Sequence, residues 1–349
     1  MDDLVSTFVP SQTILQTPFD AAVVIPTVIR PSLRRAVASV FRQRFAGRIQ
    51  VLIGIDKPIG DRAILDELRR ECPAHCVVSV FDPGYSTSLR NGGLYPGGCG
   101  GALRTILSYA ANSRAVAYLD DDNWFGEDHI RTLRGALIDH DYAFSLRWYV
   151  DRESDRPLCI DEWESVGPDA GAFRQRFGGF VDPNCLMLDK VKCEPALRWW
   201  CFPLPGDPRA MSEDRMVFDY LRKHHRGSAT GRATSYYVIH PEDGMHPRRL
   251  QWVREKTGAA VPVGRGQVED ARRAADDAAR GADDDPAAGP GGGGGQGGQY
   301  ADVPPQLPGD GDRQRPEQRR DAGGGPADGL SRVGEGNQAL RPPGGRADA

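Results

Sequence analysis

The sequence of 349 residues lacks several features that would assign it to a broad class of protein. It has no apolar run near the ~18–20 residues that a membrane-spanning helix needs. Its start, Met1-Asp2-Asp3, has neither the basic nor the apolar region of a secretory signal. Its seven cysteines form no Cys-x-x-Cys pair and are odd in number, which disfavours a zinc ribbon and a disulfide framework. The formal charge of −4 lacks the basic excess of nucleic-acid-binding proteins. We therefore expect a cytoplasmic protein with reduced thiols, no membrane span and no nucleic-acid partner.

Residues 266–349 are poor in the side chains that build a hydrophobic core. They contain no Ile, Phe, Trp, Met, Lys or Cys and one aromatic residue, Tyr300, but 20 of the 42 glycines and 9 of the 27 prolines. Such a segment cannot bury enough apolar surface to offset the entropy of ordering the chain. We expect an N-terminal extension over 1–18, one globular domain over 19–257, and a disordered, low-complexity tail over 258–349.

Continuous apolar segments alternate with amphipathic ones over residues 21–81. The continuous segments predict buried strands and the amphipathic ones predict helices. In chain order these segments are 21–26, 31–43, 49–55, 61–70 and 77–81. The order predicts an α/β fold with a Rossmann-like, mostly parallel central sheet and helices on both faces. Ligands bind beyond the carboxyl ends of the strands in such sheets, so Thr27, Asp56 and Asp82 are candidate site residues.

Three aspartates follow the fourth predicted strand. The apolar segment 115–119 runs directly into Asp120, Asp121 and Asp122. Adjacent carboxylates repel one another and add nothing to stability, whereas clustered carboxylate oxygens suit Mg²⁺ or Mn²⁺ held together with substrate phosphates. The alternative is a solvated acidic turn before the next helix. The position at the end of a buried strand favours the metal site.

The order of these motifs resembles that of a known enzyme family. Val23-Val24-Ile25-Pro26-Thr27, Asp56, the triple aspartate and a later Glu213-Asp214 follow one another as in the nucleotide-sugar glycosyltransferases of family 2, which have the GT-A fold. The resemblance covers residues 19–255 and depends on order and spacing rather than on any single motif. After Thr27 the sequence departs from the family, because only Arg30 matches the usual polar residues there.

The resemblance implies a role for each matching residue. Contacts with the nucleotide-sugar donor are implied for Pro26, Thr27, Arg30, Asp56, Arg104, Asp120 and Asp121. Among these, Asp56 would accept a hydrogen bond from the base, and Asp120 and Asp121 would contact the ribose and the sugar. Asp122 is implied as the direct ligand of Mn²⁺ or Mg²⁺, and His240 as a further metal ligand. The structural alternatives are a turn residue for Asp56, a solvated helix arginine for Arg104 and a structural histidine for His240.

Ser212-Glu213-Asp214 precedes an amphipathic segment that predicts a helix over 212–224. A serine at the N-cap and acids in the first turn stabilise a helix, and that role alone would explain the motif. The resemblance implies in addition that Asp214 is the general base that takes the proton from the acceptor hydroxyl. It implies that Glu213 contacts the acceptor.

The resemblance also suggests an acceptor pocket. Asp182 and Asn184 fall where the family shapes this pocket. Aromatic faces suit sugar rings, so Trp199 and Trp200 are candidates to line it, with core packing as the alternative.

These features together predict a metal-dependent, inverting glycosyltransferase of the hexosyl type. Its donor would be a nucleotide-diphosphate sugar, uridine-linked, and its acceptor a hydroxyl of a glycan, a lipid-linked molecule or a protein, with peripheral membrane contact left open. The family suggests a role in cell-envelope polysaccharide. One alternative is a sugar-phosphate nucleotidyltransferase, although Val24-Ile25-Pro26-Thr27 lacks the Gly-rich, basic signature expected after the first strand. The other alternative is a non-catalytic nucleotide- or glycan-binding module.

Overall fold

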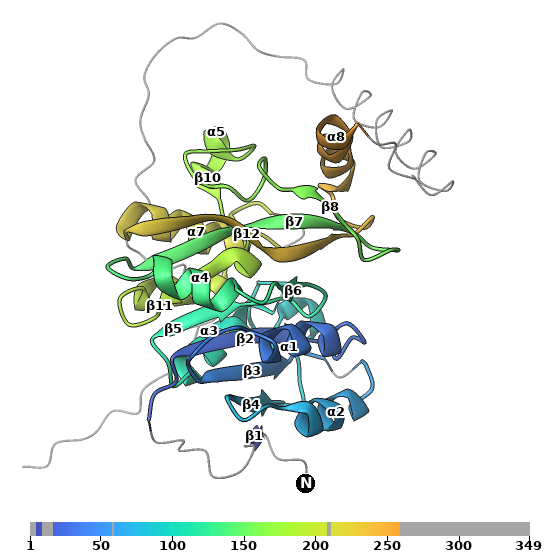
Figure 1. Ribbon diagram of the computed structural model, residues 1–349, viewed down its shortest axis with the longest axis vertical. Coiled ribbons are helices and arrows are strands. Elements are labelled where there is room, and N and C mark those ends of the chain that lie inside the picture. Colours follow the sequence, from blue (N-terminus) through green and yellow to red (C-terminus); the bar gives the residue numbers. More distant parts are fainter. Residues whose placement is uncertain (1–4, 9–16, 58, 99, 208–210, 259–349) are drawn as a thin grey trace, which may run out of the picture. The chain divides into compact units, whose positions relative to one another are not determined.

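The computed structural model describes residues 5–8, 17–57, 59–98, 100–207 and 211–258, which all belong to one compact unit, 1–284 (Figure 1). The predicted tail lies outside the described residues from position 259 onward, and so does the second unit, 285–349. None of the described helices combines the length and the apolar character that a membrane crossing requires.

The strands of the described residues range in length from two to 13 residues. In chain order they are β1 (Val5–Phe8), β2 (Ala21–Thr27), β3 (Ile49–Ile55), β4 (Cys76–Phe81), β5 (Ala115–Tyr118), β6 (Trp124–Phe125), β7 (Tyr142–Asp151), β8 (Pro157–Ile160), β9 (Gly167–Pro168), β10 (Gly179–Phe180), β11 (Leu186–Asp189) and β12 (Gly227–Ile239).

The helices alternate with the strands in the first half of the domain and follow irregular segments in the second. The α-helices are α1 (Leu33–Phe41), α2 (Ala63–Glu71), α3 (Gly101–Ala110), α4 (His129–Ala136), α5 (Arg174–Phe177), α6 (Glu194–Leu197), α7 (Glu213–His224) and α8 (His246–Thr257). The 3₁₀ segments are η1 (Leu89–Asn91), η2 (Pro183–Cys185) and η3 (Arg198–Cys201).

One ten-stranded sheet forms the centre of the domain, in the order β1-β4-β3-β2-β5-β11-β7-β12-β6, with β8 paired to β7. The neighbours β4, β3, β2 and β5 run parallel, as the sequence predicts. The rest of the sheet is mixed, because β11 is antiparallel to both β5 and β7 whereas β12 is parallel to β7. The predicted α/β class is confirmed, and the parallel arrangement belongs to the first half of the sheet.

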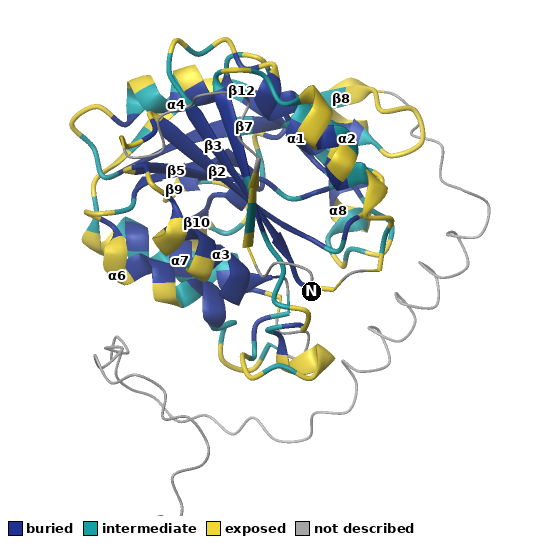
Figure 2. Cartoon of the chain, turned by 90° about the horizontal axis from the view of Figure 1, so that it is seen from below, coloured by how far each residue is buried: buried dark blue, intermediate teal, exposed yellow. Residues whose placement is uncertain are grey.

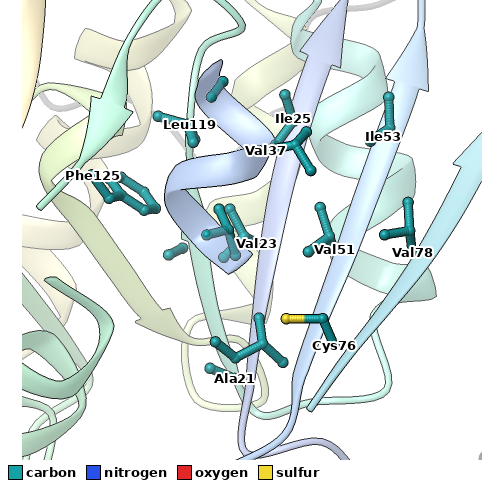
Figure 3. Packing of buried hydrophobic residues seen from close by; sticks show 14 of the residues in the cluster. Ala21, Val23, Ile25, Val37, Val51, Ile53, Cys76, Val78, Leu119 and Phe125 are labelled. Atoms are coloured by element: carbon teal, nitrogen blue, oxygen red, sulfur yellow. The ribbon is translucent and has the colours of Figure 1, made fainter. Parts of the chain in front are cut away.

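Side chains of β2 alternate between two hydrophobic cores, one on each face of the sheet. Ala21, Val23 and Ile25 belong to the first core, to which α1, α2 and α4 contribute (Figure 3). Ala22 and Val24 belong to the second, to which α3, α6 and α7 contribute. Every residue of β2 is buried, which explains why its sequence is continuously apolar rather than alternating (Figure 2).

The sequence pattern did not predict several of the strands and helices. β1, which lies in the predicted N-terminal extension, pairs with β4, and the short strand β6 pairs with β12. The segment 151–177, which the sequence analysis did not assign, contains β8, β9 and α5. α8 packs on the second half of the sheet, where its Trp252 stacks on Trp163 with 6.2 Å between ring centroids.

Candidate functional site

Three parallel strands end at the same edge of the sheet, and predicted site residues follow each of them. β2 ends at Thr27, β3 ends immediately before Asp56, and β5 ends shortly before Asp120. Because these strands are neighbours and run parallel, their carboxyl ends meet. The structure thus brings the end of β2, Asp56 and the aspartate triplet to one edge.

Asp121 is the buried member of the triplet, with 1% of its surface exposed. Its Oδ2 accepts a hydrogen bond of 2.6 Å from the Thr27 hydroxyl and one of 3.4 Å from the Val28 amide, and its Oδ1 pairs with the Arg30 guanidinium. Burial raises the pKa of Asp121, while Arg30 and Thr27 oppose the rise. Both oxygens therefore bind the turn after β2, an arrangement that favours a positioning role over the predicted contact with ribose or sugar.

Asp122 faces His240, which follows β12. The Oδ2 atom of Asp122 lies 3.4 Å from Nε2 of His240 and 3.7 Å from Nη1 of Arg30. Burial alone would raise the pKa of Asp122, but His240 and Arg30 outweigh burial and lower the pKa. Apart from this contact with Asp122, the buried Nε2 atom of His240 has no hydrogen-bond partner in the described part of the chain. The two predicted metal ligands are therefore adjacent.

The donor atoms of Asp122 and His240 fit a divalent cation. A carboxylate beside an imidazole nitrogen without another hydrogen-bond partner suits Mn²⁺ better than Mg²⁺, because Mg²⁺ binds mainly oxygen ligands. The described residues contain no group of three or more His, Cys, Asp or Glu side chains that could hold a metal ion. The remaining ligands would therefore have to come from a substrate phosphate and water.

Asp120 connects the aspartate triplet to α3 and η2. Its Oδ1 pairs with the Arg104 guanidinium of α3, and its Oδ2 accepts a hydrogen bond of 2.8 Å from Nδ2 of Asn184. A second hydrogen bond joins the two residues, because Oδ1 of Asn184 accepts a hydrogen bond of 2.7 Å from the backbone amide of Asp120. The same Asn184 amide group donates to Asp182 at 2.7 Å. The two residues predicted to shape the acceptor pocket thus contact the triplet, one directly and one through Asn184.

The helix α3 contacts both the triplet, through Arg104, and the Glu213-Asp214 pair at the start of α7, through Gly101. Burial raises the pKa of Asp214 to about 6, and the adjacent Glu213 adds to the rise. Arg215 opposes the rise most, and Arg104 opposes it to a smaller extent. The Asp214 side chain keeps 23% of its surface exposed. This carboxylate is therefore partly accessible and more basic than that of an ordinary aspartate.

Glu213 is 2% exposed and lies against Gly97, where a Cβ would come within 2.6 Å of Oε1. Ser212 occupies the N-cap position of α7, but its hydroxyl makes no capping bond. It donates to the carboxylate of Asp207 at 2.6 Å and accepts the Leu204 amide at 2.9 Å. The predicted serine cap is wrong, because the hydroxyl oxygen accepts the Leu204 amide instead of an amide of the first turn of α7. The acids of the first turn still interact favourably with the helix dipole.

The glycines before and within the start of α3 allow close packing of the protein on itself. Gly100 has a φ of 72°, and a Cβ there would lie 2.8 Å from that of Pro26. A Cβ at Gly101 would collide with the carbonyl oxygen of Trp200. At both positions the space that a side chain would need is filled by the chain itself.

Asp56 is 8% exposed and is held by the loop after β4. Its Oδ1 accepts hydrogen bonds from the Ser86 hydroxyl at 2.9 Å and the Thr87 amide at 3.2 Å. Among the hydrogen bonds of the described residues, none reaches Oδ2, which can accept one from a ligand. Asp82 pairs instead with Arg62 of the neighbouring helix region. Of these two aspartates, Asp56 is thus the better candidate for a ligand contact.

The sequence analysis did not single out Arg147, which lies at the centre of a buried ion-pair cluster. Arg147 of β7 is 0% exposed and pairs with Asp161 at 2.8 Å, Glu164 at 2.7 Å and Asp182 at 2.5 Å. Arg249 of α8 also pairs with Glu164, at 2.7 Å. Burial raises the pKa of Asp182 to about 6, although Arg147 opposes the rise. An arginine inside an otherwise apolar strand was the signal that could have revealed this Arg147 cluster.

Of the two tryptophans predicted to line an acceptor pocket, Trp200 lies in the core. It is 1% exposed, and its ring lies 4.8 Å from that of Tyr118. Trp199 is partly exposed and lies beside Tyr220 with 6.2 Å between ring centroids. Among the histidines, His129 is buried, its ring bonds Thr234 at 2.8 Å, and burial lowers its pKa to about 3, which keeps it neutral.

No family model and no curated protein sequence matches this chain. Among solved structures, the chain is similar to S. aureus TarS, with a TM-score of 0.45 and 16% identity over 67% of this chain and 39% of that one. The complex of TarS 1-349 with UDP matches with a TM-score of 0.44 and 15% identity over 68% of this chain and 65% of that one. The complex with UDP-GlcNAc matches with a TM-score of 0.45 and 14% identity over 68% and 66%. The chain thus spans 39% to 66% of the TarS chains, and the likeness concerns the fold alone.

Proposed function

We propose that this chain is a metal-dependent, inverting glycosyltransferase that moves a sugar from a uridine-linked nucleotide-diphosphate sugar to a hydroxyl acceptor. The observation that carries the proposal is that α3 lies against two sets of carboxylates. Its Arg104 pairs with Asp120, beside the Asp122–His240 pair. Its first residue, Gly101, lies against Glu213, because a Cβ there would be 3.5 Å from Oε1 of that residue, and Asp214 follows Glu213 in the chain. This proximity supports a donor site and a base in one neighbourhood.

Asp214 would act as the general base. Its carboxylate accepts the proton of the acceptor hydroxyl, and the oxygen so activated attacks the anomeric carbon of the donor sugar. The bond between that carbon and the diphosphate oxygen breaks on the opposite side, which inverts the configuration. A pKa of about 6 makes Asp214 a stronger base than an ordinary aspartate while leaving it largely ionised at neutral pH.

Asp122 and His240 would hold the cation, Mn²⁺ or Mg²⁺, with the donor diphosphate completing its ligands. When bound, such an ion neutralises negative charge on the leaving nucleotide. Arg30 and Arg104 supply fixed positive charge at the same edge of the sheet, where they can bind anionic groups of the donor and orient them.

Asp56 would recognise the base. Two donors hold its Oδ1, so the carboxylate is fixed while Oδ2 can accept a hydrogen bond. A carboxylate accepts and does not donate, so it favours a base with an N–H at that position, such as the N3–H of uracil, over cytosine, whose N3 is an acceptor.

A turnover screen tests the proposal. The full chain is incubated with Mn²⁺ and UDP-, GDP- and CDP-sugars, and release of nucleoside diphosphate is measured with and without sugar and polyol acceptors. We expect release from UDP-sugars that is lost in EDTA and in Asp214→Asn, with UDP binding retained in that variant. Asp219→Asn, on the same helix but paired with Lys223 at 2.5 Å, serves as the matched control.

Other outcomes would contradict the proposal. Formation of pyrophosphate from UTP and a sugar phosphate would identify a nucleotidyltransferase. Tight binding of UDP without any metal-dependent release from any UDP-sugar would identify a binding module. Full activity in Asp214→Asn would show that this residue is not the base.

A further inference from the structure

The turn between β2 and α1 holds a buried, β-branched residue in a strained backbone conformation. Ile29 has a φ of 61°, in the left-handed region that such residues rarely adopt. Its side chain is 0% exposed and belongs to the first core. On the outer side of the turn, Gly60 donates to the Val28 carbonyl at 3.1 Å, and a Cβ at Gly60 would collide with the Ile29 carbonyl oxygen. Strain of this kind persists only where the surroundings fix the conformation.

Asp121 fixes the turn from the inner side. Its carboxylate accepts hydrogen bonds from Thr27 and Val28 before the strained residue and pairs with Arg30 after it. The Thr27 hydroxyl that donates to Asp121 in turn accepts the Ile29 amide at 2.8 Å. One buried carboxylate thus holds both flanks of the strained residue.

The consequence of this arrangement is the position of Arg30. Its side chain is 53% exposed, yet Nη1 is held by Asp121 and lies 3.7 Å from Oδ2 of Asp122. A guanidinium has five N–H donors, and the hydrogen bonds of the described residues engage only Nη1. The remaining donors are accessible beside the predicted metal ligand, at the edge of the sheet where a donor diphosphate would bind.

We propose that Asp121 is a positioning residue, which holds the strained turn so that Arg30 presents its guanidinium to the diphosphate of the donor. This inference rests on the proposed function, because it takes a nucleotide diphosphate as the ligand. It gives Asp121 a role other than contact with ribose or sugar. It also accounts for how Ile29 keeps a backbone conformation that favours glycine.

The test compares UDP with uridine, which differ in the diphosphate. Dissociation constants are measured by calorimetry, with Mn²⁺ and again in EDTA, for the wild-type chain, Arg30→Ala, Asp121→Asn and the double variant. Arg30→Ala should weaken the binding of UDP about tenfold, which is the effect of losing one charge-assisted hydrogen bond. It should change the affinity for uridine by less than about twofold. Asp121→Asn should do the same, because an amide would turn a donor toward Arg30, and it should add nothing in the Arg30→Ala background.

Arg34→Ala is the matched control, because Arg34 lies on the exposed side of α1 and pairs with Glu67 and Glu71. It should leave both affinities unchanged. The inference is overturned if Asp121→Asn keeps the wild-type ratio of UDP to uridine affinity, or if it weakens both ligands equally. Binding of UDP with these shifts but without turnover of any UDP-sugar would contradict the proposed function and keep the inference. A wild-type chain that binds no nucleoside diphosphate would overturn both.

Discussion

The Nε2 atom of His240 lies 3.4 Å from Oδ2 of Asp122, so the residue after β12 contacts the residue group after β5. This contact joins the second half of the domain to the first at the edge of the sheet where the donor is proposed to bind. In the described parts of the chain, no third His, Cys, Asp or Glu side chain joins this pair to complete a metal site. The pair should therefore bind a cation weakly alone and more tightly with a diphosphate.

The first prediction concerns metal dependence. Asp122→Asn and His240→Ala should each raise the Mn²⁺ concentration for half-maximal activity at least about tenfold, because each removes a metal ligand. His140→Ala should leave this concentration unchanged, since that exposed histidine bonds the Ile138 carbonyl in the segment after α4. An unchanged Mn²⁺ requirement in both ligand variants would contradict the assignment. The measurement is a Mn²⁺ titration of UDP release.

The second prediction concerns pH. If Asp214 is the base, kcat/KM should rise with pH through a midpoint near its pKa of about 6 and level off above it, because only the carboxylate accepts a proton. An aspartate at the ordinary value of 3.8 would place the midpoint much lower. The pH–rate profile at saturating Mn²⁺ measures the midpoint, and the residual activity of Asp214→Asn should lack this limb.

The third prediction concerns the stability of the same residue. Burial raises the pKa of Asp214 in the folded state above the unfolded value, so its ionisation opposes folding at neutral and higher pH. Asp214→Asn should therefore raise the free energy of unfolding by roughly 1–3 kcal/mol at pH 8, with the gain vanishing below about pH 4. Urea unfolding at several pH values measures the difference. A variant less stable than wild type at pH 8 would contradict the raised pKa.

The strands and the edge of the sheet could be predicted from sequence, whereas the partners of the site residues could not. The continuous apolar run of β2 and the acids after β5 are local signals, and they correctly indicated a buried strand and the strand end at which the aspartates lie. The contact between Asp122 and His240, by contrast, depends on how β12 pairs with β7, which no local pattern specifies. The prediction of a serine cap on α7 failed for a similar reason, since the Ser212 hydroxyl accepts the Leu204 amide rather than an amide of the helix.

The Arg147 cluster shows another limit of local reasoning. Its carboxylates Asp161 and Glu164 lie in a segment without periodicity, and its second cation comes from α8, a helix with little amphipathic signal. Charge balance inside a core is a property of the whole fold. A single arginine within an apolar strand is the only sequence feature that hints at it.

The fourth prediction tests that cluster. Arg147→Met should lower the free energy of unfolding by about 3–5 kcal/mol, because it leaves buried carboxylates without their central cation. Arg147→Lys should also destabilise, since one ammonium cannot match the planar fork that reaches three carboxylates. Arg152→Met is the control, because Arg152 pairs with Glu242 at the surface and should contribute less than about 1 kcal/mol. Equal losses at both positions in urea unfolding would contradict the role of Arg147.

The fifth prediction compares two helical glycines. A Cβ at Gly101 would collide with the Trp200 carbonyl, so Gly101→Ala should displace α3 and destabilise the fold by more than about 2 kcal/mol. Gly135 of α4 has nothing within 4 Å of such a Cβ, and Gly135→Ala should stabilise by about 0.5–1 kcal/mol. Thermal unfolding of both variants measures the contrast, and a loss of similar size at both would contradict the packing described for α3.

The contact of Arg249 with Glu164 limits the order in which parts of the chain can fold during synthesis. A ribosome releases β7 and the acidic segment after it well before α8. Until α8 emerges, Arg147 is the one cation of the cluster and faces the carboxylates of Asp161, Glu164 and Asp182. The second half of the sheet can therefore reach its final charge balance only when α8 has been made, which makes that helix a late step in folding.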